Sequence, residues 1–207
     1  MEEVKKKKGM NLPNKITCCR LVLAVIVLIV MCLNSVGVFN VKEYSILNVT
    51  VNPIYLVCGV LFIIGSITDF LDGYLARSRN LVTDFGKVTD AVADKVLVNG
   101  VLILLAYDHF LPVIVPVIII TRDIAVDCIK MTAGNKGKVV AASWPGKIKT
   151  ICMMVGLSLT FFYDIPFAFI GAGTYVSDGL VYIATILSIY SGVQYYLAYK
   201  DFIFKEM

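Results

Sequence analysis

Long apolar stretches alternate with short polar segments along most of the chain. Each stretch has about 20 residues, the length that a helix needs to cross about 30 Å of hydrocarbon. The pattern predicts six membrane-spanning helices, at residues 21–39, 54–75, 90–107, 111–129, 148–170 and 180–200. Residues that end or interrupt helices, such as Pro53, Pro112 and Gly171, fall between these stretches.

Composition agrees with this pattern. Of the 207 residues, 58% are hydrophobic and only 16% are charged, and the mean hydropathy is +0.82. These values are far from those of a soluble domain, so we expect an all-α integral membrane protein. We expect an N-terminal segment at residues 1–20, one six-helix domain at 21–201 and a short tail at 202–207. No signal-peptide cleavage site follows the first apolar stretch, so this span should remain in the mature protein.

Basic residues are distributed unevenly between the predicted loops. With the N-terminus inside, only Lys42 of the 19 Lys and Arg residues falls in an outer loop. Since cytoplasmic segments carry the excess of Lys and Arg, both termini are predicted to be cytoplasmic.

The segment before the first span has an apolar and a polar side. Leu12, Ile16 and Leu21 share the apolar side, while Lys15 and Arg20 lie toward the polar one. Together with the preceding lysines, this pattern predicts an interfacial helix attracted to anionic lipid. A plain juxtamembrane anchor and a direct contact with substrate remain alternatives for this segment.

A cluster of acids follows the second span. The string DFLDGYLARSRNLVTDFGKVTDAVAD contains the pattern DxxDGxxAR, eight residues, then GxxxDxxxD. On a helix, the first five fixed positions fall within an arc of about 140° and the last three follow at every fourth residue. The fixed positions are Asp69, Asp72, Gly73, Ala76, Arg77, Gly86, Asp90 and Asp94. Two helices so marked can bring four carboxylates together.

Carboxylates close to hydrocarbon are costly unless they are paired. The bases inside the string, Arg77, Arg79 and Lys87, are too few and too dispersed to neutralise four acids at one point. Hard divalent cations with oxygen ligands would do so, and we expect a dinuclear Mg²⁺ or Mn²⁺ site. The alternative, helix caps or solvated acids at a membrane surface, is disfavoured by four acids at these spacings beside two glycines and an arginine.

A basic segment lies between the fourth and fifth spans. Residues 121–150 contain Arg122, Lys130, Lys136, Lys138, Lys147 and Lys149. Part of this charge is ordinary cytoplasmic bias. The sequence GKIKT at 146–150 nevertheless suits phosphate, because it places two point charges beside a hydroxyl group and a glycine backbone. We therefore predict a phosphate-binding role for this segment.

The acidic string resembles the signature of the CDP-alcohol phosphotransferase family. MNLPNKITCCR at 10–20 and the basic segment resemble, more narrowly, bacterial members that transfer a phosphatidyl group from CDP-diacylglycerol to sn-glycerol 3-phosphate. Two positions depart from the expected pattern without loss of charge, Lys130 in place of arginine and Asp123 in place of glutamate. The last span resembles nothing beyond a membrane helix.

The resemblance implies six transmembrane helices, a homodimer and two divalent cations at the cytoplasmic boundary of a bacterial cell membrane. It implies that Asp69, Asp72 and Asp90 bind metal, and that Asp94 is both a ligand and the general base. The implied CDP-lipid site contains Gly73, Ala76, Arg77 and Gly86. No nucleic-acid partner is expected.

The acceptor that this resemblance implies carries a phosphate of its own, which needs a cationic pocket distinct from the metals. The candidate residues for that pocket are Arg122, Lys147 and Lys149, followed by Lys130, Lys138 and Ser143.

Three other functions stay open. Within the family, the acceptor could be phosphatidylglycerol, serine or an inositol phosphate, which the aspartates cannot decide. A divalent-cation transporter would need acids along a path across the bilayer, yet spans one, four, five and six offer at most Asp127 at mid-depth. A non-catalytic scaffold would leave the acidic pattern unexplained. Nucleophilic catalysis has little support, since His109 is the single histidine and the six cysteines form no CxxC pair.

Overall fold

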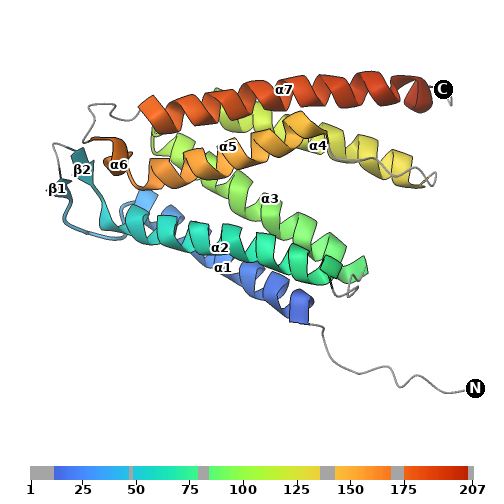
Figure 1. Cartoon of the computed structure of the whole chain (residues 1–207). Coiled ribbons are helices and arrows are strands. Elements are labelled where there is room, and N and C mark those ends of the chain that lie inside the picture. Colours follow the sequence, from blue (N-terminus) through green and yellow to red (C-terminus); the bar gives the residue numbers. More distant parts are fainter. Residues whose placement is uncertain (1–11, 47–48, 79–83, 136–142, 169–174, 205–207) are drawn as a thin grey trace, which may run out of the picture.

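The computed structural model describes residues 12–46, 49–78, 84–135, 143–168 and 175–204. Within these residues the chain forms six long helices, a two-stranded hairpin and one short helix (Figure 1). The long helices are α1 (Leu12–Ser35), α2 (Pro53–Ser78), α3 (Asp84–Tyr107), α4 (Ile114–Asn135), α5 (Trp144–Phe161) and α7 (Tyr175–Phe204). The strands β1 (Tyr44–Ile46) and β2 (Val49–Val51) pair antiparallel, and α6 spans Ile165–Ala168.

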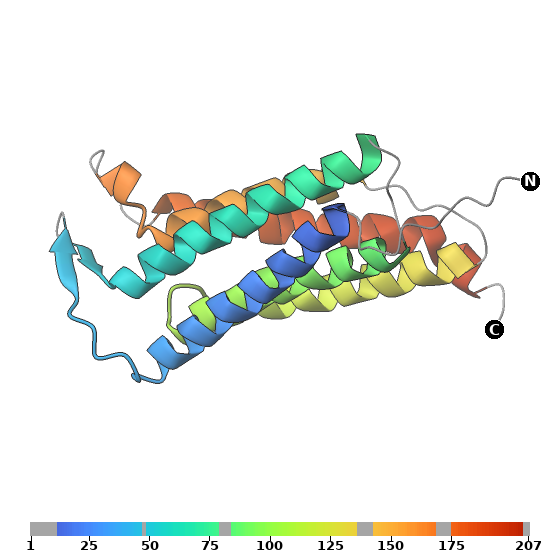
Figure 2. The same cartoon turned by 90° about the horizontal axis from the view of Figure 1, so that it is seen from below.

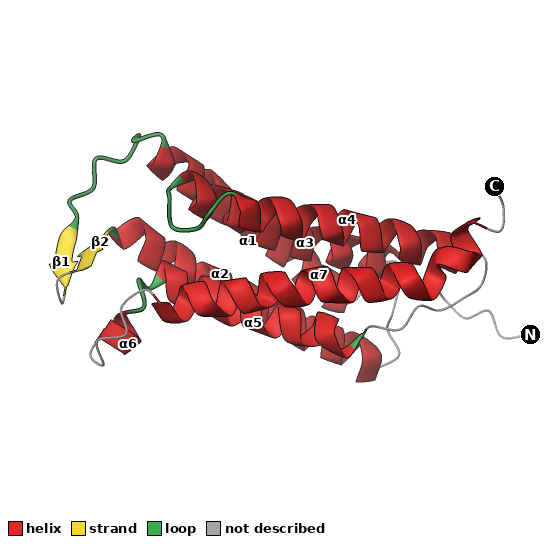
Figure 3. Cartoon of the chain, turned by 90° about the horizontal axis from the view of Figure 1, so that it is seen from above, coloured by secondary structure: helices red, strands yellow, loops and turns green. Residues whose placement is uncertain are grey.

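The six long helices form an elongated bundle of two halves. In one half α1 packs against α2 and α3, and in the other α4 and α5 pack against α7. Contacts between α2 and α5 and between α3 and α4 join the halves. Figures 2 and 3 show the hairpin and α6 at one end, the hairpin end, and the start of α1 with the end of α7 at the other, the terminal end. The end of α2 and the start of α3 also lie at the terminal end.

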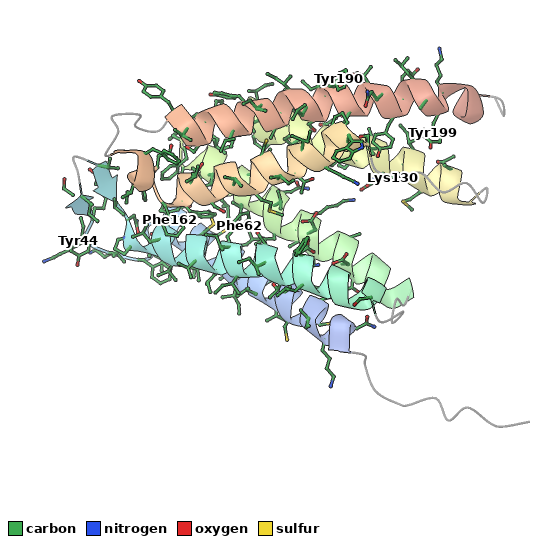
Figure 4. All side chains as sticks on the ribbon, viewed as in Figure 1. Tyr44, Phe62, Lys130, Phe162, Tyr190 and Tyr199 are labelled. Carbon is green, nitrogen blue, oxygen red and sulfur yellow. The ribbon has the colours of Figure 1, made fainter. Side chains whose placement is uncertain are left out.

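Apolar side chains fill the interior and also cover the outside of the bundle. Met31, Phe62, Leu102 and Phe161 are fully buried, and the ring of Phe62, labelled in Figure 4, lies 5.6 Å from that of Phe161. Many large apolar side chains on the outer faces are exposed, among them Ile29, Ile67, Val117, Ile186 and Leu197. A surface of this kind requires an apolar surrounding.

Three of the described helices are long and apolar enough to cross a membrane, at Asn14–Ser35, Pro53–Leu71 and Tyr175–Lys200. The chain is therefore a helical membrane protein. Each predicted span coincides with part of one long helix, although the bounds differ. The hairpin is the exception to an all-α fold, and its three-residue strands are too short to leave a pattern in the sequence.

The start of α1 corrects one expectation, the exposure of Arg20. The predicted interfacial segment and the first span belong to one helix that runs without a break across Leu21. Arg20, which the pattern places on the polar side, is only 2% exposed. That placement is wrong because the charge of Arg20 is paired inside the bundle, as described below.

The end of α5 corrects a second expectation. The predicted span at 148–170 is not one helix, since α5 ends at Phe161. The chain then turns through Tyr163 and Asp164, whose φ angles are 54° and 51°, in the left-handed region. The buried carboxylate of Asp164 accepts hydrogen bonds from the backbone N–H of Ser177 at 3.2 Å and from its hydroxyl at 2.6 Å. This contact with α7 fixes a turn that hydropathy alone cannot reveal.

Candidate functional site

Arg20 of α1 joins two of the motif acids at the terminal end. Its Nη1 pairs with Oδ1 of Asp69 on α2, and its Nη2 lies 2.5 Å from Oδ1 of Asp90 on α3. The same Nη2 donates to the backbone carbonyl of Asp90 at 3.4 Å. The Arg20 side chain is 1% exposed, whereas that of Asp69 is 34% exposed. Three helices therefore meet at one buried cation flanked by two partly exposed carboxylates.

The remaining motif positions lie on the same two helices. Gly73 is a half-buried position of α2, and Gly86 is a half-buried position of α3. The side chains of Asp72, Ala76 and Arg77 on α2 lie outside the described residues. Among the described side chains, no group of three or more His, Cys, Asp or Glu is placed to hold a metal ion. Asp72 of the motif is not among these side chains, because its side chain is not described.

A cavity of about 270 Å³ adjoins the acidic site between α3, α4, α5 and α7. Asp94, one helical turn beyond Asp90, forms part of its wall. The structure brings five of the six residues predicted for the acceptor phosphate to the same cavity, namely Arg122, Lys130, Ser143, Lys147 and Lys149. Lys138, the sixth, lies outside the described residues. Segments far apart in the sequence thus share one polar cavity with the predicted base.

The charge of this cavity is positive. Its wall contains five basic and three acidic side chains, a formal excess of two positive charges. Some of this charge is already paired, because Lys95 forms an ion pair with Asp127. The excess favours an anion that carries about two negative charges.

Arg122 is held by contacts from α4 and α7. Its Nε donates to the Ser188 carbonyl at 3.0 Å, and its Nη2 donates to the Ser191 hydroxyl at 2.6 Å. Its Nη1 donates to Asp123 at 2.8 Å. The glycine at position 192 leaves room for the Arg122 side chain against α7, since a Cβ at that position would lie 2.9 Å from Cγ of Arg122.

Lys149 of α5 pairs with the same carboxylate. Its Nζ donates to both oxygens of Asp123, at 2.7 and 2.9 Å, and Lys149 is 7% exposed. Asp123 thus lies between two cations. The half-buried Asp123 carboxylate holds the guanidinium of Arg122 and the ammonium group of Lys149 at the wall of the cavity, and one of the two positive charges stays uncompensated.

Ser143 and Lys130 complete the wall. Ser143 is the N-cap of α5, with its hydroxyl accepting from the Gly146 N–H at 3.3 Å, and its own N–H donates to the Tyr195 hydroxyl at 2.9 Å. Lys130, labelled in Figure 4, extends from α4 toward α7, and its Nζ is 5.4 Å from the centre of the Tyr195 ring. The N-terminus of α5 adds the positive end of a helix dipole to this side of the cavity.

Several residues of the site escape prediction from the sequence. The contribution of α7 comes from Ser188, Ser191 and Tyr195, which are spaced by three and four residues on one face of a mostly apolar helix. That spacing is a signal, but small polar residues in membrane helices more often serve packing. Arg20 is detectable only as a charge inside a helix that continues into an apolar run.

Comparisons with known proteins agree on one family. The family model described as CDP-alcohol phosphatidyltransferase matches residues 10–190. The protein named CDP-diacylglycerol–glycerol-3-phosphate 3-phosphatidyltransferase from Bacillus subtilis is 36% identical over 90% of this chain and 93% of its own length. Proteins of the same name from Mycoplasma genitalium and Rickettsia bellii are 34% and 31% identical, over 89% and 93% of this chain. The alignments cover 82% and 97% of those two proteins.

Proposed function

Because the chain belongs to the CDP-alcohol phosphatidyltransferase family, we propose that it transfers the phosphatidyl group of CDP-diacylglycerol to sn-glycerol 3-phosphate. The products would be phosphatidylglycerophosphate and CMP. Relatives that match most of the chain bear this activity in their names. The structural observation that carries the proposal is the positively charged cavity beside Asp94.

Asp69, Asp72, Asp90 and Asp94 are the proposed ligands of two divalent cations, Mg²⁺ or Mn²⁺. The described acids fit such ions, because Asp69 and Asp90 converge from two helices on a single cationic group. Carboxylate oxygens are also the donors that these ions prefer. When bound, the cations would neutralise the diphosphate of the lipid substrate and stabilise the departing CMP.

The proposed reaction begins at Asp94, which accepts the proton of the 1-hydroxyl of glycerol 3-phosphate. The resulting oxygen attacks the phosphorus that carries diacylglycerol, and the bond from that phosphorus to the CMP oxygen breaks in line with the attack. Gly73, Ala76, Arg77 and Gly86 are proposed to border the CDP-lipid on the acidic side. Missing or small side chains there allow a nucleotide to approach the helix backbone closely.

The phosphate of the acceptor is proposed to bind in the cavity. A phosphate monoester carries about −1.5 to −2 charges at neutral pH, which matches the formal excess of two positive charges in the wall. Arg122 and Lys149 are the proposed main contacts, since both are fixed by Asp123 at the same wall. Lys130, Ser143 and Lys147 also line the cavity and would complete the phosphate site, with Lys138 as a further candidate.

The proposed arrangement in the membrane has all six long helices spanning the bilayer and the active site on the cytoplasmic side. The start of α1 and the end of α7 lie at the terminal end of the bundle, with the acidic site (Figure 1). Lys42, between α1 and β1, is the base that positive-inside bias places outside. We propose a homodimer in a bacterial cell membrane.

The direct test is CMP release by purified protein with CDP-diacylglycerol and a panel of acceptors. Glycerol 3-phosphate should support turnover, whereas phosphatidylglycerol, serine and inositol phosphate should not. Turnover with one of the other acceptors and none with glycerol 3-phosphate would place the chain elsewhere in the family. Cation flux in vesicles without CMP release would favour the transporter.

Gly192→Ala tests the acceptor pocket. The added Cβ would lie 2.9 Å from Cγ of Arg122, close to its backbone, so the whole arginine must shift. Loss of one charge-assisted contact costs about 1.5 to 3 kcal/mol, or about ten- to a hundredfold in kcat/KM for glycerol 3-phosphate. The KM for CDP-diacylglycerol should change little.

Gly179→Ala on the same helix is the matched control, because a Cβ there meets nothing within 4 Å. It should leave both kinetic constants unchanged. A Gly192→Ala effect confined to CDP-diacylglycerol would show that the cavity serves the nucleotide or lipid and not the acceptor.

A further inference from the structure

Arg20 is the most deeply buried cation of the described structure next to the acidic motif. Its residue is 2% exposed, deeper than Lys149 at 7%. Removing a guanidinium from water is costly, and it is tolerated only where the charge is paired and hydrogen bonded. The two pairing groups come from Asp69 of α2 and Asp90 of α3. The burial of Arg20 therefore depends on these two carboxylates.

The two carboxylates depend equally on Arg20. Asp69 and Asp90 project from different helices toward the same point, so their negative charges repel each other unless a cation lies between them. The planar guanidinium faces the two acids with different nitrogens: Nη1 forms the ion pair with Asp69, and Nη2 donates to Asp90. A lysine ammonium is a point charge without this forked geometry. Arg20 thus supplies a fixed positive charge between these two acids from a helix outside the motif.

We propose that Arg20 is an internal counter-ion that holds Asp69 and Asp90 in place when no divalent cation is bound. The acid pair is thereby assembled across α1, α2 and α3 before metal arrives. This inference rests on the proposed metal site and extends it to a residue outside the motif. Arg20 is a positioning residue, because it contacts the acids and not the reacting groups.

The inference makes metal and Arg20 partly interchangeable as stabilisers. Both neutralise the same two carboxylates, so the loss of one matters most when the other is absent. An arginine that served only to pack α1 would contribute equally with and without metal. This difference separates a counter-ion from a packing residue.

The test is thermal unfolding of the purified full chain in detergent, in EDTA and in excess Mg²⁺. Arg20→Gln should lower the unfolding temperature in EDTA by about 5 °C or more, and Mg²⁺ should recover more than half of the loss. Arg20→Lys should fall between the wild type and Arg20→Gln in EDTA. Lys15→Gln, which removes an exposed charge from the same helix, should behave as the wild type in both conditions.

An equal loss in EDTA and in Mg²⁺ would overturn the counter-ion inference. Binding of Mn²⁺, followed by electron paramagnetic resonance, separates that failure from failure of the proposed function. Mn²⁺ that binds the wild type without rescuing Arg20→Gln overturns the inference alone, whereas an absence of Mn²⁺ binding by the wild type overturns the metal site as well.

A second variant covers the case in which Arg20→Gln yields no folded protein. Adding Asp69→Asn removes one of the two repelling charges, so the double variant should yield folded protein in EDTA. A double variant that folds no better than Arg20→Gln would overturn the inference.

Discussion

Removal of divalent cations with EDTA is expected to abolish phosphatidyl transfer, and added Mg²⁺ or Mn²⁺ is expected to restore it. The proposed site holds four motif acids and receives a diphosphate, and the described structure supplies one buried cation, Arg20, between two of those acids. One guanidinium cannot neutralise both the acids and the substrate. The measurement is CMP release from CDP-diacylglycerol with saturating glycerol 3-phosphate.

The control for this experiment is EDTA already saturated with Mg²⁺, which should leave the rate unchanged. Thermal unfolding in the same buffers would show that EDTA leaves the protein folded. Full turnover in excess EDTA would rule out the dinuclear site and would require another source of positive charge at the diphosphate.

Asp94→Asn is expected to lower kcat by about 10²- to 10⁴-fold, the usual contribution of a general base. The substitution keeps the shape of the side chain at the wall of the cavity but removes its ability to accept a proton. Binding of CMP or CDP-diacylglycerol should largely survive. The measurements are kcat from CMP release and nucleotide affinity from calorimetry.

Asp178→Asn is the matched control for Asp94→Asn. Asp178 lies in the first turn of α7, at the hairpin end of the bundle and far from the acidic site (Figure 1). Its substitution should leave kcat unchanged. Near-normal turnover by Asp94→Asn would remove Asp94 as the base and leave it at most a ligand.

The sequence predicts the number and order of the long helices because hydrocarbon-length apolar runs leave few alternatives. The sequence does not predict where these helices begin and end. Apolar residues continue past Phe161, so the turn at Tyr163 and Asp164 is invisible to hydropathy, and only the contact of Asp164 with Ser177 reveals it. The helix before Leu21 is predicted, but its continuity with the first span, as the single helix α1, is not.

Within the candidate site, the residues that can be predicted are those that belong to local sequence patterns. The acidic string and the basic segment give residues that the structure brings to one region, with Asp94, Arg122 and Lys149 around a single cavity. The contributions of Arg20 and Gly192 arise from contacts between helices distant in the sequence. No spacing along one helix encodes such contacts, so they require the folded arrangement.

The pairing of Arg20 has a consequence for how the chain enters the membrane during synthesis. Its partner Asp90 is made 70 residues later, a delay of roughly 4 to 14 s at about 5 to 20 residues per second. Asp69 of α2 is made earlier and is the first partner available, while water and lipid phosphates at the bilayer surface can solvate the rest of the guanidinium. The pairing of Arg20 is therefore complete only after α3 has been made, which couples the burial of this one side chain to the arrival of the third helix.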